Sequence, residues 1–121
     1  MRGTDVLRGA LALLGDAPAS AEAGYEDRAA AMLGMVYQSL LPPDRILKRH
    51  RGKAPVLITD FSLPLDSDPG IEDDFFACAC HLLASELTAF EDSDLSAALF
   101  VRGEALKRLV AESIPFEVKR L

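Results

Sequence analysis

The first candidate for chemistry is a metal site formed by Cys78, Cys80 and His81. Cys78 and His81 lie about one helical turn apart, so the two side chains could share an ion. Cys80 would face another side of the same helix, whereas a structural zinc site needs four ligands, usually in two well-spaced pairs. His50 is the only other histidine. We therefore favour small core residues for both cysteines and a polar-face position for His81, and we expect no metal and no cofactor.

The second candidate is a cation site in an acidic stretch. Its members are Asp66, Asp68, Glu72, Asp73 and Asp74. Their spacing lacks the ligand order of an EF-hand loop, and no positioned base accompanies them. Compensation of a helix macrodipole explains them better, because they precede a helical apolar pattern. No Ser-His-Asp or Cys-His arrangement and no glycine-rich phosphate loop can be identified, so we expect no catalytic residue and no enzyme.

A basic run occupies the middle of the chain, and it consists of Arg45, Lys48, Arg49, Arg51 and Lys53. No aromatic residue is interleaved with it to stack on bases. The formal net charge of -6 also disfavours a protein that wraps duplex DNA, since the phosphate backbone is itself negative. Three interpretations stay open for the run: a solvated loop, contact with an acidic partner or a neighbouring copy, and nucleic-acid binding.

The elements that must position these residues are predicted to be helices. A short amino-terminal helix is expected over Val6–Leu14, with Thr4 or Asp5 as its cap. Gly15 should end that helix in a left-handed turn. A longer helix should follow from about Tyr25 to Leu41, because its apolar residues recur at helical spacing.

The middle segment, residues 44–69, is predicted to be an extended arm or a small β-hairpin. Pro42-Pro43 is expected to end the preceding helix, because proline lacks the amide donor and pushes its predecessor out of the helical region. Apolar and polar residues then alternate as in a strand, and Pro64 would restrict such a strand to a sheet edge. Residues 114–121 form a carboxyl-terminal arm that is too short to fold alone, so it docks on its own domain, docks on a neighbour or stays loose.

The chain is organised around a predicted hairpin of two antiparallel helices between Ile71 and Ser113. The polar residues Glu91 to Asp94 interrupt the apolar pattern and offer a cap for the second helix. Two striped helices joined by so short a turn should bury their stripes together. The stripes are Phe75, Phe76, Ala79, Leu82, Leu83, Leu87 and Phe90, then Leu95, Leu99, Leu106, Leu109 and Val110.

Four further residues of the hairpin are candidates for an ion pair or an interface. Glu86 and Arg102 each lie within an apolar stripe, so we predict a partly buried ion pair that fixes the hairpin register; the alternative is that each meets a different chain. Phe100 and Val101 lie off the inward stripe. They indicate either a subunit interface or a wider core.

The order of these features is the basis of a family resemblance. A short helix ends in Leu13-Leu14-Gly15-Asp16, and a second begins with Tyr25-Glu26-Asp27-Arg28. Leu63-Pro64-Leu65 precedes the acidic helix start, and Phe75 to Ala84 leads to the Glu91–Asp94 turn and a last helix. This layout resembles the small head-to-tail connector (adaptor) proteins of tailed bacteriophages and prophages. The resemblance implies one all-α domain over residues 1–121, a bundle of about four helices, which also suits a chain of 121 residues.

The resemblance also implies a function and partners. Such a protein assembles as a ring below the portal, prolongs the DNA channel and forms a platform for the next tail or stopper protein. DNA passes through without sequence-specific binding. The expected location is the virion neck, after synthesis in the bacterial host cytoplasm, with no membrane involved. The alternative is a small cytosolic helical regulatory or partner-binding module, in one version directed to nucleic acid through Arg45–Lys53.

Interface residues follow from the same resemblance. Contact between subunits is assigned to the segment from Arg45 to Phe61, and docking is assigned to the carboxyl-terminal arm. The docking residues are Lys119, Arg120 and Leu121, with Phe116 as a further candidate in that arm.

Overall fold

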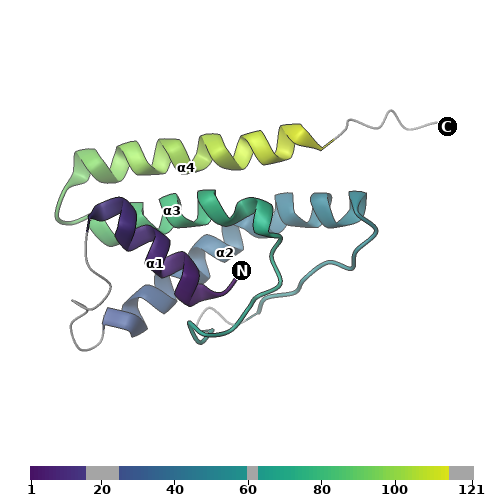
Figure 1. The fold of residues 1–121 in the computed structure, drawn as a ribbon, viewed down its shortest axis with the longest axis horizontal. Coiled ribbons are helices and arrows are strands. Elements are labelled where there is room, and N and C mark those ends of the chain that lie inside the picture. Colours follow the sequence, from purple (N-terminus) through teal and green to yellow (C-terminus); the bar gives the residue numbers. More distant parts are fainter. Residues whose placement is uncertain (16–24, 60–62, 115–121) are drawn as a thin grey trace.

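The computed structural model describes residues 1–15, 25–59 and 63–114. This part of the chain forms an all-helical bundle without strands, which confirms the predicted fold class (Figure 1). The α-helices are α1 (Gly3–Leu14), α2 (Tyr25–His50), α3 (Phe76–Thr88) and α4 (Ser93–Ser113), and a 3-10 turn, η2 (Asp73–Phe75), leads into α3.

Helix α3 is the central element, and α1, α2 and α4 all pack against it. It is buried over most of its circumference, as expected for a helix built almost entirely from apolar and small residues. A glycine in α1 and another in α4 allow these two helices to pack closely against α3. A Cβ on Gly9 of α1 would lie 2.5 Å from Cys80 Sγ, and one on Gly103 of α4 would lie 2.7 Å from Leu82 Cδ2. Any larger residue at these two positions would push α1 or α4 away from α3.

The antiparallel hairpin of α3 and α4 forms as predicted, with a turn over residues 89–92. Asp92 caps α4, because its Oδ1 accepts a hydrogen bond from the Leu95 amide (3.0 Å). Three members of the predicted stripes are exposed: Phe90 by 98%, Leu109 by 61% and Leu95 by 38%. Phe90 belongs to the turn, beyond the end of α3, and Leu95 lies in the first turn of α4. Leu109 lies on the flank of α4, about 80° round the helix from the buried Leu99.

The predicted ion pair between Glu86 and Arg102 does not form. Both side chains are exposed, and no ion pair joins them in the described part of the chain. Reciprocal hydrogen bonds set the register instead: Ser85 Oγ donates to Ser96 O and Ser96 Oγ donates to Ser85 O, both at 2.8 Å. With Ser85 opposite Ser96, Arg102 lies at about the level of Ala79, roughly two turns from Glu86.

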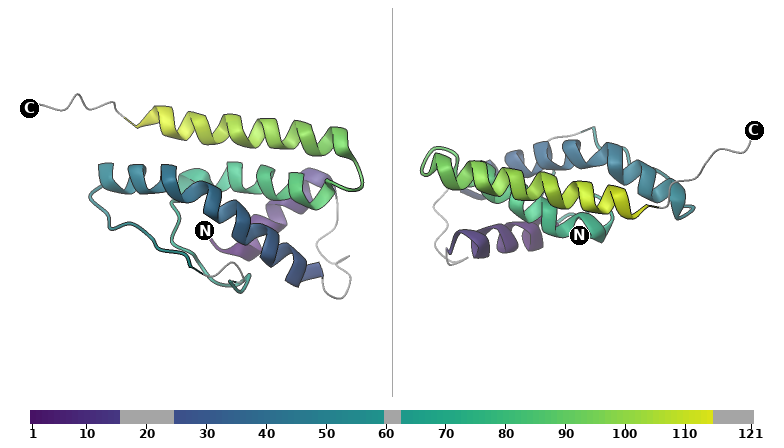
Figure 2. Two further views of the ribbon diagram at one scale, coloured as in Figure 1. Left: turned by 180° about the vertical axis from the view of Figure 1, so that it is seen from behind. Right: turned by 90° about the horizontal axis from the view of Figure 1, so that it is seen from above.

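The predicted end of α2 at Pro42-Pro43 is wrong, since α2 continues through both prolines to His50. Proline in a helix interior removes a backbone hydrogen bond and tends to bend the helix. Figure 2 shows that α2 changes direction part-way along its length. Burial of Leu47 and of the Asp44–Lys48 pair in the second half of the helix offsets the loss, because these side chains are at most 4% exposed.

The middle segment after α2 has no helix or strand in its described parts, 51–59 and 63–72, and residues 65–67 form a turn. We call these residues the middle arm. This arm also caps α1. The Gly3 and Thr4 amides donate to the carbonyls of Ser67 (3.3 Å) and Leu65 (2.8 Å). Thr4 and Asp5 are therefore not the cap that was expected, because the arm supplies acceptors for the first-turn amides.

Gly15 ends α1 in the left-handed conformation with φ 77°, as predicted. No helix among the described residues combines the length and the apolar character that crossing a bilayer would require.

Candidate functional site

The basic run and the acidic stretch, separate in the sequence, meet in one ion-pair network. At its buried end, Lys48 Nζ lies 2.8 Å from Asp44 Oδ2, 2.6 Å from the Gly70 carbonyl oxygen and 3.1 Å from Glu72 Oε2. Asp44 is 1% exposed and Lys48 4% exposed. Asp44 Oδ1 also accepts a hydrogen bond from the Glu72 amide (2.8 Å). This pair therefore ties the end of α2 to the residues that lead into α3.

Glu72 is the centre of the outer part of the network. Its Oε1 accepts hydrogen bonds from Lys53 Nζ (2.8 Å) and Arg51 Nη1 (2.9 Å). Hydrogen bonds from Lys53, then from Arg51 and Lys48, lower the pKa of Glu72 to about 2, against the opposing effect of burial. Arg51 also binds Asp74 with both guanidinium nitrogens, at 2.7 and 2.9 Å, and this lowers the pKa of Asp74.

The network changes the interpretation of the predicted basic interface. Lys48, Arg51 and Lys53 are paired with acids of their own chain. Lys48 joins α2 to the end of the middle arm, and Arg51 and Lys53 join the start of that arm to the residues that lead into α3. Arg45 and Arg49 lie exposed on α2. The Asp44–Lys48 contact has a sequence signal, the i, i+4 spacing of an acid and a base on one helix. Sequence reasoning missed that signal because it ended the helix at the prolines.

The cysteine and histidine cluster does not converge on one point. Cys78 Sγ donates to the Phe75 carbonyl oxygen (3.1 Å), and Cys80 Sγ lies against Gly9. His81 Nδ1 is bonded to the Ala77 carbonyl oxygen (2.8 Å). Burial raises the pKa of the Cys78 thiol to about 12 and that of Cys80 to about 11. The part of the chain that the structure describes contains no group of three or more metal-ligating side chains.

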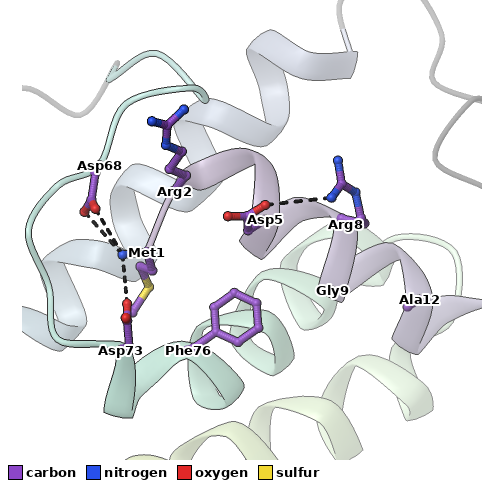
Figure 3. A pocket seen from close by; sticks show the side chains of 9 residues that line it. All are labelled: Met1, Arg2, Asp5, Arg8, Gly9, Ala12, Asp68, Asp73 and Phe76. Carbon is purple, nitrogen blue, oxygen red and sulfur yellow. Dashed lines mark hydrogen bonds and ion pairs between the residues drawn. The ribbon is translucent and has the colours of Figure 1, made fainter.

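A cleft with a volume of about 830 Å³ lies between α1 and the start of α3 (Figure 3). Its floor is formed by Gly9, Ala12 and Phe76, and charged residues line its rim. At one end, the Met1 amino group pairs with Asp73 Oδ1 at 2.9 Å and with Asp68 Oδ2 at 3.3 Å. The lining holds no thiol, hydroxyl or imidazole; its titratable groups are the Met1 amino group, two arginines and three aspartates.

The predicted interface residues Phe100 and Val101 lie on the surface of α4. Phe100 is 49% exposed and Val101 67% exposed, so neither belongs to a wider core of this chain. Figure 1 shows α4 as an outer layer, with α3 on its inner side. The remaining predicted interface residues lie outside the described residues; they are Phe61, Phe116, Lys119, Arg120 and Leu121.

Comparison of the chain with protein-family models, with curated proteins and with solved structures finds no match. The functional argument therefore depends on the residues and contacts described above.

Proposed function

We propose that this chain is a structural assembly protein that acts as a head-to-tail connector, forming a ring below a portal and a platform for the next tail component. The observation that supports the proposal is the distribution of exposed apolar residues. Among the described residues, five of the nine large exposed hydrophobic residues belong to α4 or to the turn before it. They are Phe90, Leu95, Phe100, Val101 and Leu109. Exposed apolar residues gathered on one element are typical of a protein–protein interface.

The chemistry of the described side chains supports an assembly role over catalysis. The two thiols are buried and have raised pKa values, which makes them poor nucleophiles. The cleft between α1 and the start of α3 has a rim of charged groups, several of which pair with one another, as Arg8 does with Asp5 at 3.8 Å. A rigid helical hairpin with an apolar outer side suits a component whose action is geometric.

Within this proposal, the exposed cations Arg45 and Arg49 and the apolar residues Phe100 and Val101 contact neighbouring subunits. Lys48, Arg51 and Lys53 instead hold the middle arm in place for that contact. The network weakens the alternative of a nucleic-acid-directed regulator, because it uses three of the five charges that such a module would offer to phosphates. The net charge of -6 suits a channel wall from which DNA phosphates are repelled.

The test is electron microscopy of the purified chain, alone and with the portal protein encoded beside its gene. Rings on the portal are expected. Val101→Glu should prevent them, because a charge would then be buried between subunits. Leu13→Glu is the matched control, since Leu13 is 41% exposed on α1, away from α4. The proposal would be refuted if the neighbouring genes encode no portal, capsid or tail proteins. It would also be refuted if the chain does not bind the portal.

A further inference from the structure

Helix α4 packs against the rest of the described chain through one side only. Leu99 and Gly103 are buried against α3, and Figures 1 and 2 show nothing over the opposite side among the described residues. We call that opposite side the outer face of α4. Seven positions that share this side are all exposed: Asp94, Ala97, Ala98, Val101, Ala105, Arg108 and Glu112.

The outer face has an internal symmetry about Val101. Ala97 and Ala105 lie four residues before and after Val101, and Asp94 and Arg108 lie seven residues before and after it. Residues four and seven positions apart fall on the same side of a helix. An alanine therefore lies one turn from Val101 in each direction, and an acid and a base lie at matching distances from it, with Glu112 one turn beyond Arg108.

We propose that this face binds a second copy of the chain, with the two α4 helices antiparallel and Val101 on a two-fold axis. In a two-fold interface each contact occurs twice, so Asp94 of each copy meets Arg108 of the other. Ala97 then lies against Ala105 of the second copy. The small alanine side chains allow the helix axes to come close, at the short end of the usual packing distance of about 8–10 Å.

Charge complementarity selects this partner and this orientation. Asp94 and Arg108 are about 21 Å apart along their own helix, too far to pair within one chain. Neither makes an ion pair with another described residue. A parallel arrangement in register would place Asp94 against Asp94, whereas the antiparallel arrangement joins opposite charges at both ends.

The contact is small, so the dimer is weak. A helix of 21 residues is about 31 Å long, and one helix face buries less than the roughly 1,200–2,000 Å² of a standard interface. With Val101 on the axis, Phe90, 98% exposed in the turn before α4, lies level with Glu112 of the second copy, about one turn beyond that copy's Leu109, which is 61% exposed. These two residues extend the apolar contact, and we expect a dissociation constant of about 10–100 μM for the dimer.

This inference does not depend on the connector proposal. A two-fold dimer is closed, so no further copies can add to it through the same contact. We therefore assign the dimer to the free chain, in which it covers apolar residues that a later assembly would use. The test is sedimentation velocity of the full chain at low salt, with masses compared with the 13.1 kDa monomer. Asp94→Lys and Arg108→Glu should each weaken the dimer at least about tenfold, because like charges then face each other twice.

An equimolar mixture of the Asp94→Lys and Arg108→Glu variants should dimerise again, because both contacts of the mixed pair join opposite charges. Arg102→Glu is the matched control: it changes the charge equally on the same helix, off the outer face, and should leave the dimer unchanged. Val101→Cys should form a disulfide-linked dimer on mild oxidation, whereas the buried Cys78 and Cys80 leave the unmodified chain uncrosslinked.

Four results would overturn the inference. They are a wild-type chain that stays monomeric at about 300 μM, single variants that dimerise like the wild type, a mixture that stays monomeric, and masses that grow beyond the dimer. Circular dichroism is the folding control for each variant. If a variant keeps the helical spectrum of the wild type, loss of the dimer reports loss of the contact and not of the helix.

Discussion

The buried Asp44–Lys48 pair allows the sharpest test of how this fold is held together. Lys48→Met keeps an unbranched apolar side chain and removes the ammonium group. The change deletes the contacts to Asp44, to the Gly70 carbonyl and to Glu72, at distances between 2.6 and 3.1 Å. Asp44 would remain a 1% exposed carboxylate with one described donor, the Glu72 amide.

The expected loss of unfolding free energy follows from the unpaired, buried charge of Asp44. Removal of one partner from a buried ion pair costs about 3–5 kcal/mol, because the other charge stays desolvated. The Glu72 amide still donates to Asp44, so we expect the lower end, about 3 kcal/mol. The free energy of unfolding is measured by urea denaturation, followed by circular dichroism, with the denaturant dependence compared between variants.

Lys53→Met is the matched control, because Lys53 also pairs with Glu72 at 2.8 Å but its side chain is 55% exposed. An exposed pair contributes about 0–1 kcal/mol, so the loss should be at most about 1 kcal/mol. The double variant Asp44→Asn/Lys48→Met should regain most of the stability, since no charge is then stranded. Equal losses for Lys48→Met and Lys53→Met, or a double variant as unstable as Lys48→Met, would refute the reasoning.

Three further predictions concern pH, close packing and an unpaired hydroxyl. Because the pKa of Glu72 is lowered from 4.5 to about 2 in the folded chain, the unfolded chain binds more protons between these values, and stability should fall as pH drops through them. Glu72→Gln should flatten this part of a plot of unfolding free energy against pH; an unchanged slope would contradict the assignment. Gly103→Ala should lower stability by about 1–2 kcal/mol in thermal unfolding despite the better helix propensity of alanine, because the added Cβ would lie 2.7 Å from Leu82 Cδ2. Tyr37→Phe should raise stability by about 1 kcal/mol in urea, since the buried Tyr37 hydroxyl has no hydrogen-bond partner in the described part of the chain; a comparable loss would reveal a partner.

Local sequence patterns predicted the elements whose causes are local. The spacing of Phe75, Leu82 and Leu99 predicted the hairpin, and these residues are at most 8% exposed. Asp92 caps α4 and Gly15 ends α1, as their residue types indicated. Each of these features depends on neighbours within about one helical turn, so a short stretch of sequence contains the information that specifies it.

Elements with distant partners were predicted poorly. The prolines at 42 and 43 predicted a helix end, but packing of residues far away in the sequence keeps α2 intact beyond them. The pair of Glu86 and Arg102 was predicted from helical wheels, and the actual register, set by Ser85 and Ser96, separates the two side chains. A wheel gives the direction of a side chain but not its level along the neighbouring helix.

The sequence by itself determined the all-α class, the hairpin with its cap, and the presence of one basic and one acidic stretch. Only the tertiary structure decided that these stretches neutralise each other through Lys48, Arg51, Lys53, Glu72 and Asp74, and that an apolar face of α4 stays uncovered. The physical reason is the separation along the chain over which each interaction acts. Helix propensity, capping and apolar periodicity act over a few residues, whereas an ion pair forms between groups about 20 residues apart only after the backbone has brought them within about 3 Å.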